Sequence, residues 1–143
     1  MDPDYLRSEL FIHDELARRA EQAVSKIPDL WREHKSIYPT LLLWPEDDVR
    51  TTTRERFSGV IFSELPLAQA DRLIFIEKAV ARCGAYAVLV TEQLPEAVRS
   101  IFETKHGTET WRLPIKDYGG AQVLGAAARR ANAESVGVLW RAN

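Results

Sequence analysis

The sequence has little cysteine and no long apolar run. Cys83 is the only cysteine among 143 residues, which excludes an internal disulfide and a cysteine zinc site and favours a reducing, cytoplasmic setting. The longest uninterrupted apolar stretch, residues 85–90, is far shorter than the roughly 20 residues of a membrane-spanning helix. Residues 1–4 carry neither the basic nor the apolar stretch of a signal peptide. We therefore expect a cytoplasmic protein with no membrane contact.

The chain also lacks the common catalytic and nucleotide-binding motifs. It contains no GxGxxG, GxxxxGK[ST], GxSxG, HExxH or CxxC sequence, and the Gly119-Gly120 pair lacks the spacing of a phosphate-binding loop. These absences disfavour the common nucleotide-binding and hydrolase classes.

No excess of one charge is present overall. The chain has 19 Lys and Arg residues against 21 Asp and Glu residues, for a net charge of −2. A dedicated nucleic-acid binder is usually basic, so this balance disfavours nucleic acid as the main partner. The charge is nevertheless uneven, because residues 1–98 hold 12 basic and 17 acidic side chains and residues 99–143 hold 7 and 4. Such asymmetry steers partners or aligns two copies head to tail.

Apolar residues at helical spacing predict three helices, over about 4–27, 66–83 and 95–105. Pro28 ends the first helix, and a further turn follows over 29–34. Gly84 caps the second helix, and His106-Gly107 closes the third. The residues predicted to face the core are Ile12, Leu16, Ala20, Ala23 and Ile27 in the first helix, Leu73, Ile76, Val80 and Cys83 in the second, and Val98, Ile101 and Phe102 in the third.

Short apolar or alternating runs predict the strands. Residues 40–44, 57–62, 85–91 and 108–115 are the clearest, with a bulge at Gly59 and a turn at 118–120. Residues 85–91 are apolar on both faces, which indicates a central strand. Residues 46–48 form a turn, and 49–56 an edge strand or a loop. Near the end we favour a hairpin of 121–129 with 136–142, with a helix over 121–130 as the alternative.

The predicted order is therefore α-β-β-α-β-α-β-β-β. It defines a single-domain layered α/β sandwich, with α+β as the alternative class. We expect a mixed five- to six-stranded sheet with about three helices, in which residues 1–35 pack on a core of 39–143. The two β-α-β connections predict right-handed crossovers between parallel neighbours.

Three carboxylates form one candidate site. Glu46 and Asp48 follow the first strand, and Glu92 follows the central one. If these strands are parallel neighbours, their carboxyl ends converge, and the oxygens could hold a divalent cation such as Mg²⁺. The alternative is an ordinary acidic turn.

Basic residues form a second candidate site. Arg50, Arg54 and Arg56 alternate with threonines and can bind nucleic-acid phosphates, although such charges also protect an exposed edge strand. The histidines have structural explanations, since His106 suits a helix end. Cys83 lies in a helical stripe, where free cysteine acts as a small hydrophobe.

Aromatic and aliphatic side chains near the predicted sheet edges form a third candidate site. Phe57, Ile61 and Trp140 suit a homodimer interface, and symmetric dimers are the commonest oligomers. The sequence thus predicts a non-enzymatic protein-interaction or accessory module that acts as a homo-oligomer, with another protein as a further partner. A small metal-assisted or acid–base enzyme that uses the carboxylates is the alternative, and nucleic-acid binding is a weaker one.

Overall fold

The structure is a computed structural model that describes residues 3–51 and 59–140. Within these ranges the helices are α1 (Pro3–Val24), α2 (Ile27–His34), α3 (Glu46–Thr51) and α4 (Gln69–Cys83). The strands are β1 (Thr40–Pro45), β2 (Ile61–Glu64), β3 (Ala85–Gln93), β4 (Ala97–Thr104), β5 (Gly107–Tyr118), β6 (Ala121–Leu124) and β7 (Ala128–Ala131).

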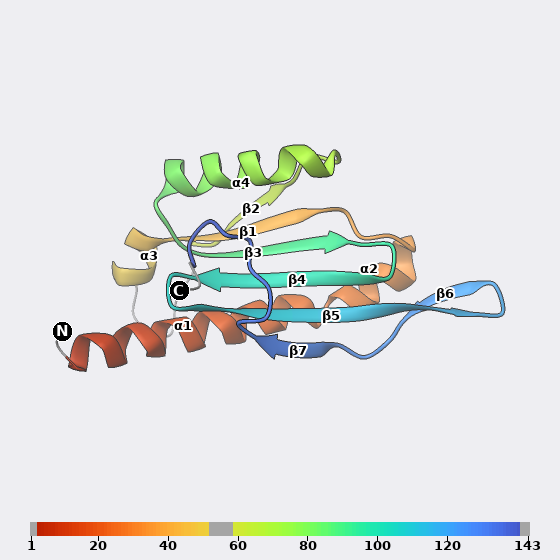
Figure 1. The fold of residues 1–143 in the computed structure, drawn as a ribbon, viewed down its shortest axis with the longest axis horizontal. Helices are drawn as coiled ribbons and strands as arrows, with labels where there is room; N and C mark the ends of the chain where they lie inside the picture. The colour runs from red at the N-terminus through yellow and green to blue at the C-terminus, as the bar shows by residue number, and fades with distance from the viewer. Residues whose placement is uncertain (1–2, 52–58, 141–143) are drawn as a thin grey trace.

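All of these strands belong to one seven-stranded sheet with the order β2-β1-β3-β4-β5-β6. Strand β7 also pairs with β5, alongside residues 109–112, whereas β6 pairs with residues 115–118. Every pairing is antiparallel. Because β5 pairs with both β6 and β7 along its length, it extends well past its neighbours in the sheet (Figure 1).

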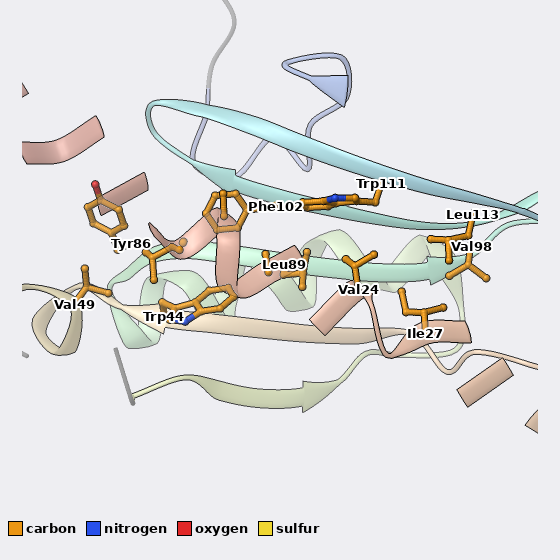
Figure 2. Close-up of a cluster of buried hydrophobic side chains, with 14 of the residues drawn as sticks. Val24, Ile27, Trp44, Val49, Tyr86, Leu89, Val98, Phe102, Trp111 and Leu113 are labelled. Carbon is orange, nitrogen blue, oxygen red and sulfur yellow. The ribbon is translucent and has the colours of Figure 1, made fainter. Parts of the chain in front are cut away.

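Helices cover both faces of the sheet. Figure 1 shows α1 passing behind β4 and β5, with α4 at the opposite side of the molecule near β1 and β2. On the α1 side, Val24 and Ile27 point onto Trp111, Leu113 and Val98 of the sheet (Figure 2). On the other side, α4 packs on β1 and β3 through a smaller cluster made of Leu41, Leu43, Leu65, Ile76, Ala85, Val88 and Val90.

The buried stripe of α1 is offset by about one residue from the predicted stripe. Leu16 and Ala20 are buried as expected, but Ile12 and Ala23 are only half-buried. The side chains that complete the buried stripe are Glu9, His13, Ala17 and Val24. Two ionisable groups therefore occupy positions on the core-facing side of this helix.

The layered α/β class predicted from the sequence is confirmed. The helix predicted over 66–83 forms as α4 from Gln69 and ends at Gly84, whose φ of +61° gives the left-handed cap, but Leu73, predicted to face the core, is 46 % exposed. Strand 85–91 forms as β3, sits between β1 and β4 and is buried on both faces. Strand 40–44 forms as β1, which pairs with β2, and β2 overlaps the predicted strand 57–62 at residues 61 and 62.

The predicted helix over 95–105 is wrong, because residues 97–104 form strand β4. Val98 and Phe102 have helical spacing, but they also alternate with Arg99 and Glu103. Strands β3 and β5 both pair with β4, and this ladder satisfies the backbone on both sides. His106 consequently lies at the β4–β5 turn rather than at a helix end, and its backbone N–H donates to Thr104 Oγ1 at 3.1 Å.

Loss of that helix removes the second predicted crossover, and the first, through α4, joins β2 to β3 with β1 between them instead of as neighbours. The sheet has seven strands rather than five or six, and it is antiparallel throughout rather than mixed. Without a helix between β3 and β4, a short connection joins them as an antiparallel pair. Strands β1 and β3 are antiparallel as well, with Leu42 opposite Leu89.

The last part of the chain forms neither the predicted hairpin nor the alternative helix. Strands β6 and β7 pair with β5 instead of with residues 136–140; residues 141–142 of the predicted hairpin lie outside the described residues. Residues 136–139 lie outside any strand, and Gly137 has a φ of +84°, which breaks an extended conformation. Their N–H groups are directed to a carboxylate of β4, as described below.

Three smaller expectations also differ. The first helix ends at Val24, and Pro28 lies in the first turn of α2. Residues 46–51 form α3 rather than a turn followed by an edge strand or a loop; residues 52–56 of that predicted segment are outside the described residues. Gly59 is not a bulge within a strand, because it lies before β2. A Cβ atom there would come within 2.1 Å of Asp48 Oδ2.

No helix within the described ranges is both long and apolar enough to span a bilayer.

Candidate functional site

Strand β2 forms one edge of the sheet. Among the described strands it pairs only with β1. The N–H of Leu65, just after β2, donates to Pro39 O at 2.9 Å, so the backbone of Leu65 faces β1. Because N–H and C=O groups alternate in direction along an extended strand, those of Ile61 and Ser63 also face β1. Those of Phe62 and Glu64 therefore face away from the sheet.

An apolar pocket of about 340 Å³ lies beside this edge, on the α1 side of the sheet. Its floor includes the buried residues Ile27 and Leu89. Three side chains at its rim are exposed to an unusual extent for their size, namely Leu30 at 45 %, Tyr38 at 48 % and Phe62 at 61 %. The pocket forms because α2 covers this face of the sheet only partly and leaves the β2 edge open.

The few polar groups in the pocket wall are mostly engaged. Thr91 Oγ1 is 2.7 Å from Ser100 Oγ, and one hydroxyl donates to the other. The N–H of Ile37 donates to Gln93 Oε1 at 2.9 Å, which fixes the segment between α2 and β1 against the end of β3. The pocket therefore offers shape and apolar surface, and its geometry suits a side chain or a small apolar group.

A second feature is a buried charged cluster where α1 meets the opposite end of the sheet. The Glu9 side chain is 1 % exposed, and Arg50 Nη1 lies 2.6 Å from its Oε1. The Tyr86 hydroxyl donates to Glu9 Oε2 at 2.7 Å, and His106 Nε2 lies 3.2 Å from the same oxygen. Arg50 also pairs with Glu46 at 2.9 Å, so the cluster joins α1, α3, β3 and the β4–β5 turn.

The electrostatics of this cluster keep Glu9 ionised. Burial favours the neutral carboxyl, but hydrogen bonds from Arg50, Tyr86 and His106 outweigh it and lower the pKa of Glu9 to about 2. Burial and the bond to Glu9 raise the pKa of Tyr86, and the bonds to Glu9 and Glu46 raise that of Arg50. Glu9 is thus held anionic, Arg50 cationic and Tyr86 neutral. These ordinary charge states suit a structural role.

His13 extends the cluster along α1. Its Nδ1 lies 2.6 Å from Thr104 Oγ1, and its ring contacts Phe102 edge-on at 5.3 Å. Burial lowers the pKa of His13, although Asp14 and Glu109 oppose this effect. The ring is therefore a packed, neutral hydrogen-bonding group.

A second buried carboxylate lies on the α4 side of the sheet. Glu103 is 0 % exposed and accepts the N–H groups of Val136 (2.7 Å), Gly137 (3.1 Å), Val138 (2.9 Å) and Leu139 (2.8 Å). We call residues 132–139 the C-terminal strap. Four consecutive N–H groups converge on one carboxylate, as they do around a bound anion.

The structure does not bring the predicted magnesium ligands together. Glu46 lies beside Gly84, where β3 begins, whereas Glu92 lies near the other end of β3, roughly 25 Å away by strand geometry. The antiparallel pairing of β1 and β3 is the physical reason, because it puts their carboxyl ends at opposite ends of the sheet. Glu92 pairs with Arg72 at 2.7 Å and Arg99 at 3.3 Å. Asp48 is in α3, and nowhere in the described ranges do three His, Cys, Asp or Glu side chains gather to hold a metal.

The other predicted site residues are dispersed or lie outside the described ranges. Arg50 is held by Glu9 and Glu46 instead of facing a phosphate, and Arg54, Arg56 and Phe57 are outside the described residues. Ile61 is 42 % exposed on the β2 edge. Trp140 is half-buried after the C-terminal strap. Cys83 is half-buried in the α4 cluster, as expected for a small hydrophobe.

Sequence reasoning missed Glu9, Glu103 and the β2 pocket. Glu9 and His13 are four residues apart and in phase with Leu16 and Ala20, so a stripe that includes them was visible in the sequence. Nothing local marks Glu103 as buried, because its four donors are more than 30 residues away. No protein family, curated protein or solved structure matches this chain.

Proposed function

We propose that this protein is a non-enzymatic interaction module that binds an extended segment of a partner protein along β2. The observation that carries the proposal is the combination of outward-facing backbone groups at Phe62 and Glu64 with an apolar pocket on the same edge. In strand addition, main-chain hydrogen bonds supply affinity and pockets for alternate side chains supply specificity. The β2 edge offers both elements.

The geometry also indicates what the partner segment contains. Phe62 lies on the same face as Leu42 and Leu89, because these residues are opposite one another in the sheet. A partner residue opposite Phe62 would place its side chain on that face, at the mouth of the pocket. We therefore expect a branched aliphatic or aromatic residue there. Glu64 favours a Lys or Arg residue opposite it, since opposite charges pair across strands.

A second copy of the chain can supply this segment, which gives the predicted homodimer a defined form. A two-fold axis at Phe62 would place the Phe62 residues of the two copies opposite each other at the pocket mouths and keep the two Glu64 side chains apart. The outward backbone groups of both residues would then pair, and one sheet would continue across two copies. We further propose a reducing, cytoplasmic setting, because Cys83 is the only cysteine in the sequence.

Selection of displayed random peptides tests the proposal. Peptides selected on the wild-type protein should have alternating β-branched and aromatic residues. Their affinity for Phe62→Lys should fall about tenfold or more, equivalent to about 1.4 kcal/mol, because the charge blocks the edge and the pocket mouth. Tyr118→Lys is the matched control, since Tyr118 is a similarly exposed aromatic, at 64 %, far along β5.

Two results would contradict strand addition at β2. One is that selected peptides bind Phe62→Lys as tightly as the wild type, and the other is that no peptide is enriched. Sedimentation of the free protein tests the homodimer separately. A dimer that Phe62→Lys dissociates and Tyr118→Lys preserves would support it, whereas a monomer at every concentration would contradict the homodimer.

A further inference from the structure

A second pocket, of about 440 Å³, lies past the end of β2 and adjoins the pocket described above. Pro39 and Leu67 line it, and both lie beyond Thr40 and Glu64, which are the last residues paired at this end of the β1–β2 ladder. The end of α2 and the segment that follows it line both pockets, through His34, Ser36, Ile37 and Tyr38. The two pockets are therefore neighbours along the continuation of the β2 edge.

The second pocket exposes apolar side chains. Leu67 is 67 % exposed, the largest fraction among the large hydrophobic residues of the described ranges, and Tyr38 is 48 % exposed. Pro39 has no N–H, so it adds no backbone donor to the wall. Exposed apolar groups of this size, gathered at one place, are typical of surfaces that bind another protein. The edge thus offers a second place for an apolar side chain of the partner.

Glu64 lies between the two pockets. It is exposed, and it shares a face of β2 with Phe62, because alternate residues of a strand point to the same side. The N–H of Leu65 donates to Pro39 O at 2.9 Å, so the chain still runs beside the start of β1 after Glu64. The order along the edge is therefore the first pocket at Phe62, the carboxylate of Glu64 and then the second pocket.

This order matches the spacing of an extended segment. A partner residue opposite Phe62 places its side chain at the first pocket, and the residue two positions along is opposite Glu64. The next residue on that face is four positions from the first, about 13 Å along the segment. Continued by two residues, the register of Thr40 with Glu64 puts Tyr38 at that level, where it lines the second pocket with Leu67.

We propose that the partner segment has the pattern apolar–x–basic–x–apolar, in which x is any residue. One apolar side chain occupies each pocket, and the basic side chain pairs with Glu64. The pattern reads the same in both directions, so it holds whether the segment runs parallel or antiparallel to β2. This inference rests on the proposed strand addition and adds to it a second anchor, the apolar side chain in the second pocket.

A segment of another protein fits this pattern better than a second copy of the chain. In the two-fold pairing around Phe62, Val60 of the second copy would be opposite Glu64. An apolar valine cannot neutralise that carboxylate, whereas a lysine or arginine can, and opposite charges stabilise a cross-strand pair. The carboxylate between the two pockets therefore favours another protein as the partner.

A double-mutant cycle tests the second anchor. In a peptide selected on the wild-type protein, each of the two apolar residues is replaced in turn by serine. On the wild type, each replacement should weaken binding about tenfold, as burial of one large apolar side chain predicts. On Leu67→Ser, one of the two replacements should weaken binding only about threefold or less, because its contact in the second pocket is already lost.

The control is Leu10→Ser, which makes the same change at a leucine that is 45 % exposed on α1 and outside both pockets. Both replacements should cost as much there as on the wild type. Equal costs on the wild type and on Leu67→Ser, or selected peptides without a basic residue between two apolar ones, would overturn the second anchor. If Phe62→Lys still weakens those peptides, strand addition stands. If Phe62→Lys has no effect, or no peptide is enriched, strand addition fails and the second anchor fails with it.

Discussion

Arg50 Nη1 lies 2.6 Å from Oε1 of Glu9, and this ion pair ties α3 to the core-facing side of α1. The Glu9 side chain is almost fully enclosed, while the Arg50 side chain is 34 % exposed. Tyr86 and His106 complete the contacts of Glu9. The cluster holds the first helix against the sheet at the end where few apolar side chains of α1 are buried.

Replacing Glu9 should therefore destabilise the protein. In Glu9→Gln, the amide cannot accept all of these hydrogen bonds and leaves Arg50 without its enclosed partner. We expect a loss of about 3 kcal/mol in the free energy of unfolding, the lower end of the range for a broken buried pair. Urea unfolding measures it. Glu15→Gln, which removes an exposed pair with Arg18, should change stability by about 0.5 kcal/mol or less, and an equally small effect of Glu9→Gln would refute the role of the cluster.

The same carboxylate predicts an acid-dependent loss of stability. The pKa of Glu9 falls from its ordinary 4.5 to about 2 on folding, so as pH drops the unfolded chain takes up this proton first. The stabilisation is complete above 4.5 and is lost as pH falls from there towards 2. Between pH 6 and pH 3, the wild type should lose about 2 kcal/mol more than Glu9→Gln. Parallel pH profiles for the two proteins would contradict this assignment.

His13 predicts a separate loss at higher pH. Burial lowers its pKa below the ordinary 6.5, so the unfolded state binds the proton first as pH falls through that value. Its contribution to stability is therefore present above 6.5 and declines below it. Unfolding measured at closely spaced pH values should show this decline in the wild type and not in His13→Gln. A pKa at or above 6.5 for His13, measured by NMR titration of its ring, would overturn the prediction.

Glu103 should control the C-terminal strap. In Glu103→Gln, the amide nitrogen would face backbone donors that the carboxylate now accepts, which leaves at least two N–H groups unpaired. A buried unpaired group costs about 1–3 kcal/mol, so we expect a loss of about 3 kcal/mol. Hydrogen exchange of residues 136–139 should become fast while β3 stays protected. Glu96→Gln, at a carboxylate that is 65 % exposed, is the control, and protection of 136–139 that survives Glu103→Gln would contradict the prediction.

The elements predicted correctly are those whose residue pattern alone matches the burial that they have in the fold. Helix α4 has apolar spacing and Gly84 at its end, and β3 is apolar on both faces, so both were found. Strand β4 was missed because Val98, Ile101 and Phe102 fit a helix and a strand equally well locally. The decision between them depends on the ladders with β3 and β5, which are tertiary interactions.

The site depended on the direction of two other strands. Convergence of Glu46 with Glu92 required β1 and β3 to be parallel, but β1 pairs antiparallel with both β2 and β3. In the antiparallel sheet, Glu46 and Glu92 lie at opposite ends of β3. The exposed edge at β2, with its pocket, is then the surface that suits binding. Ile61 was identified from its apolar character, but neither the outward backbone of Phe62 nor the pocket beside it can be read from the sequence, because both depend on register and on how far α2 extends over the sheet.

Hydrogen exchange of the β2 amides tests the central proposal most directly. In the free monomer, Ile61 and Ser63 should exchange slowly because they face β1, whereas Phe62 and Glu64 should exchange quickly. A peptide selected on the wild-type protein should slow exchange at Phe62 and Glu64 by about tenfold or more and leave Ile61 and Ser63 slow. Protection of Phe62 and Glu64 in the free monomer, or no change when the peptide binds, would show that β2 is not the binding edge.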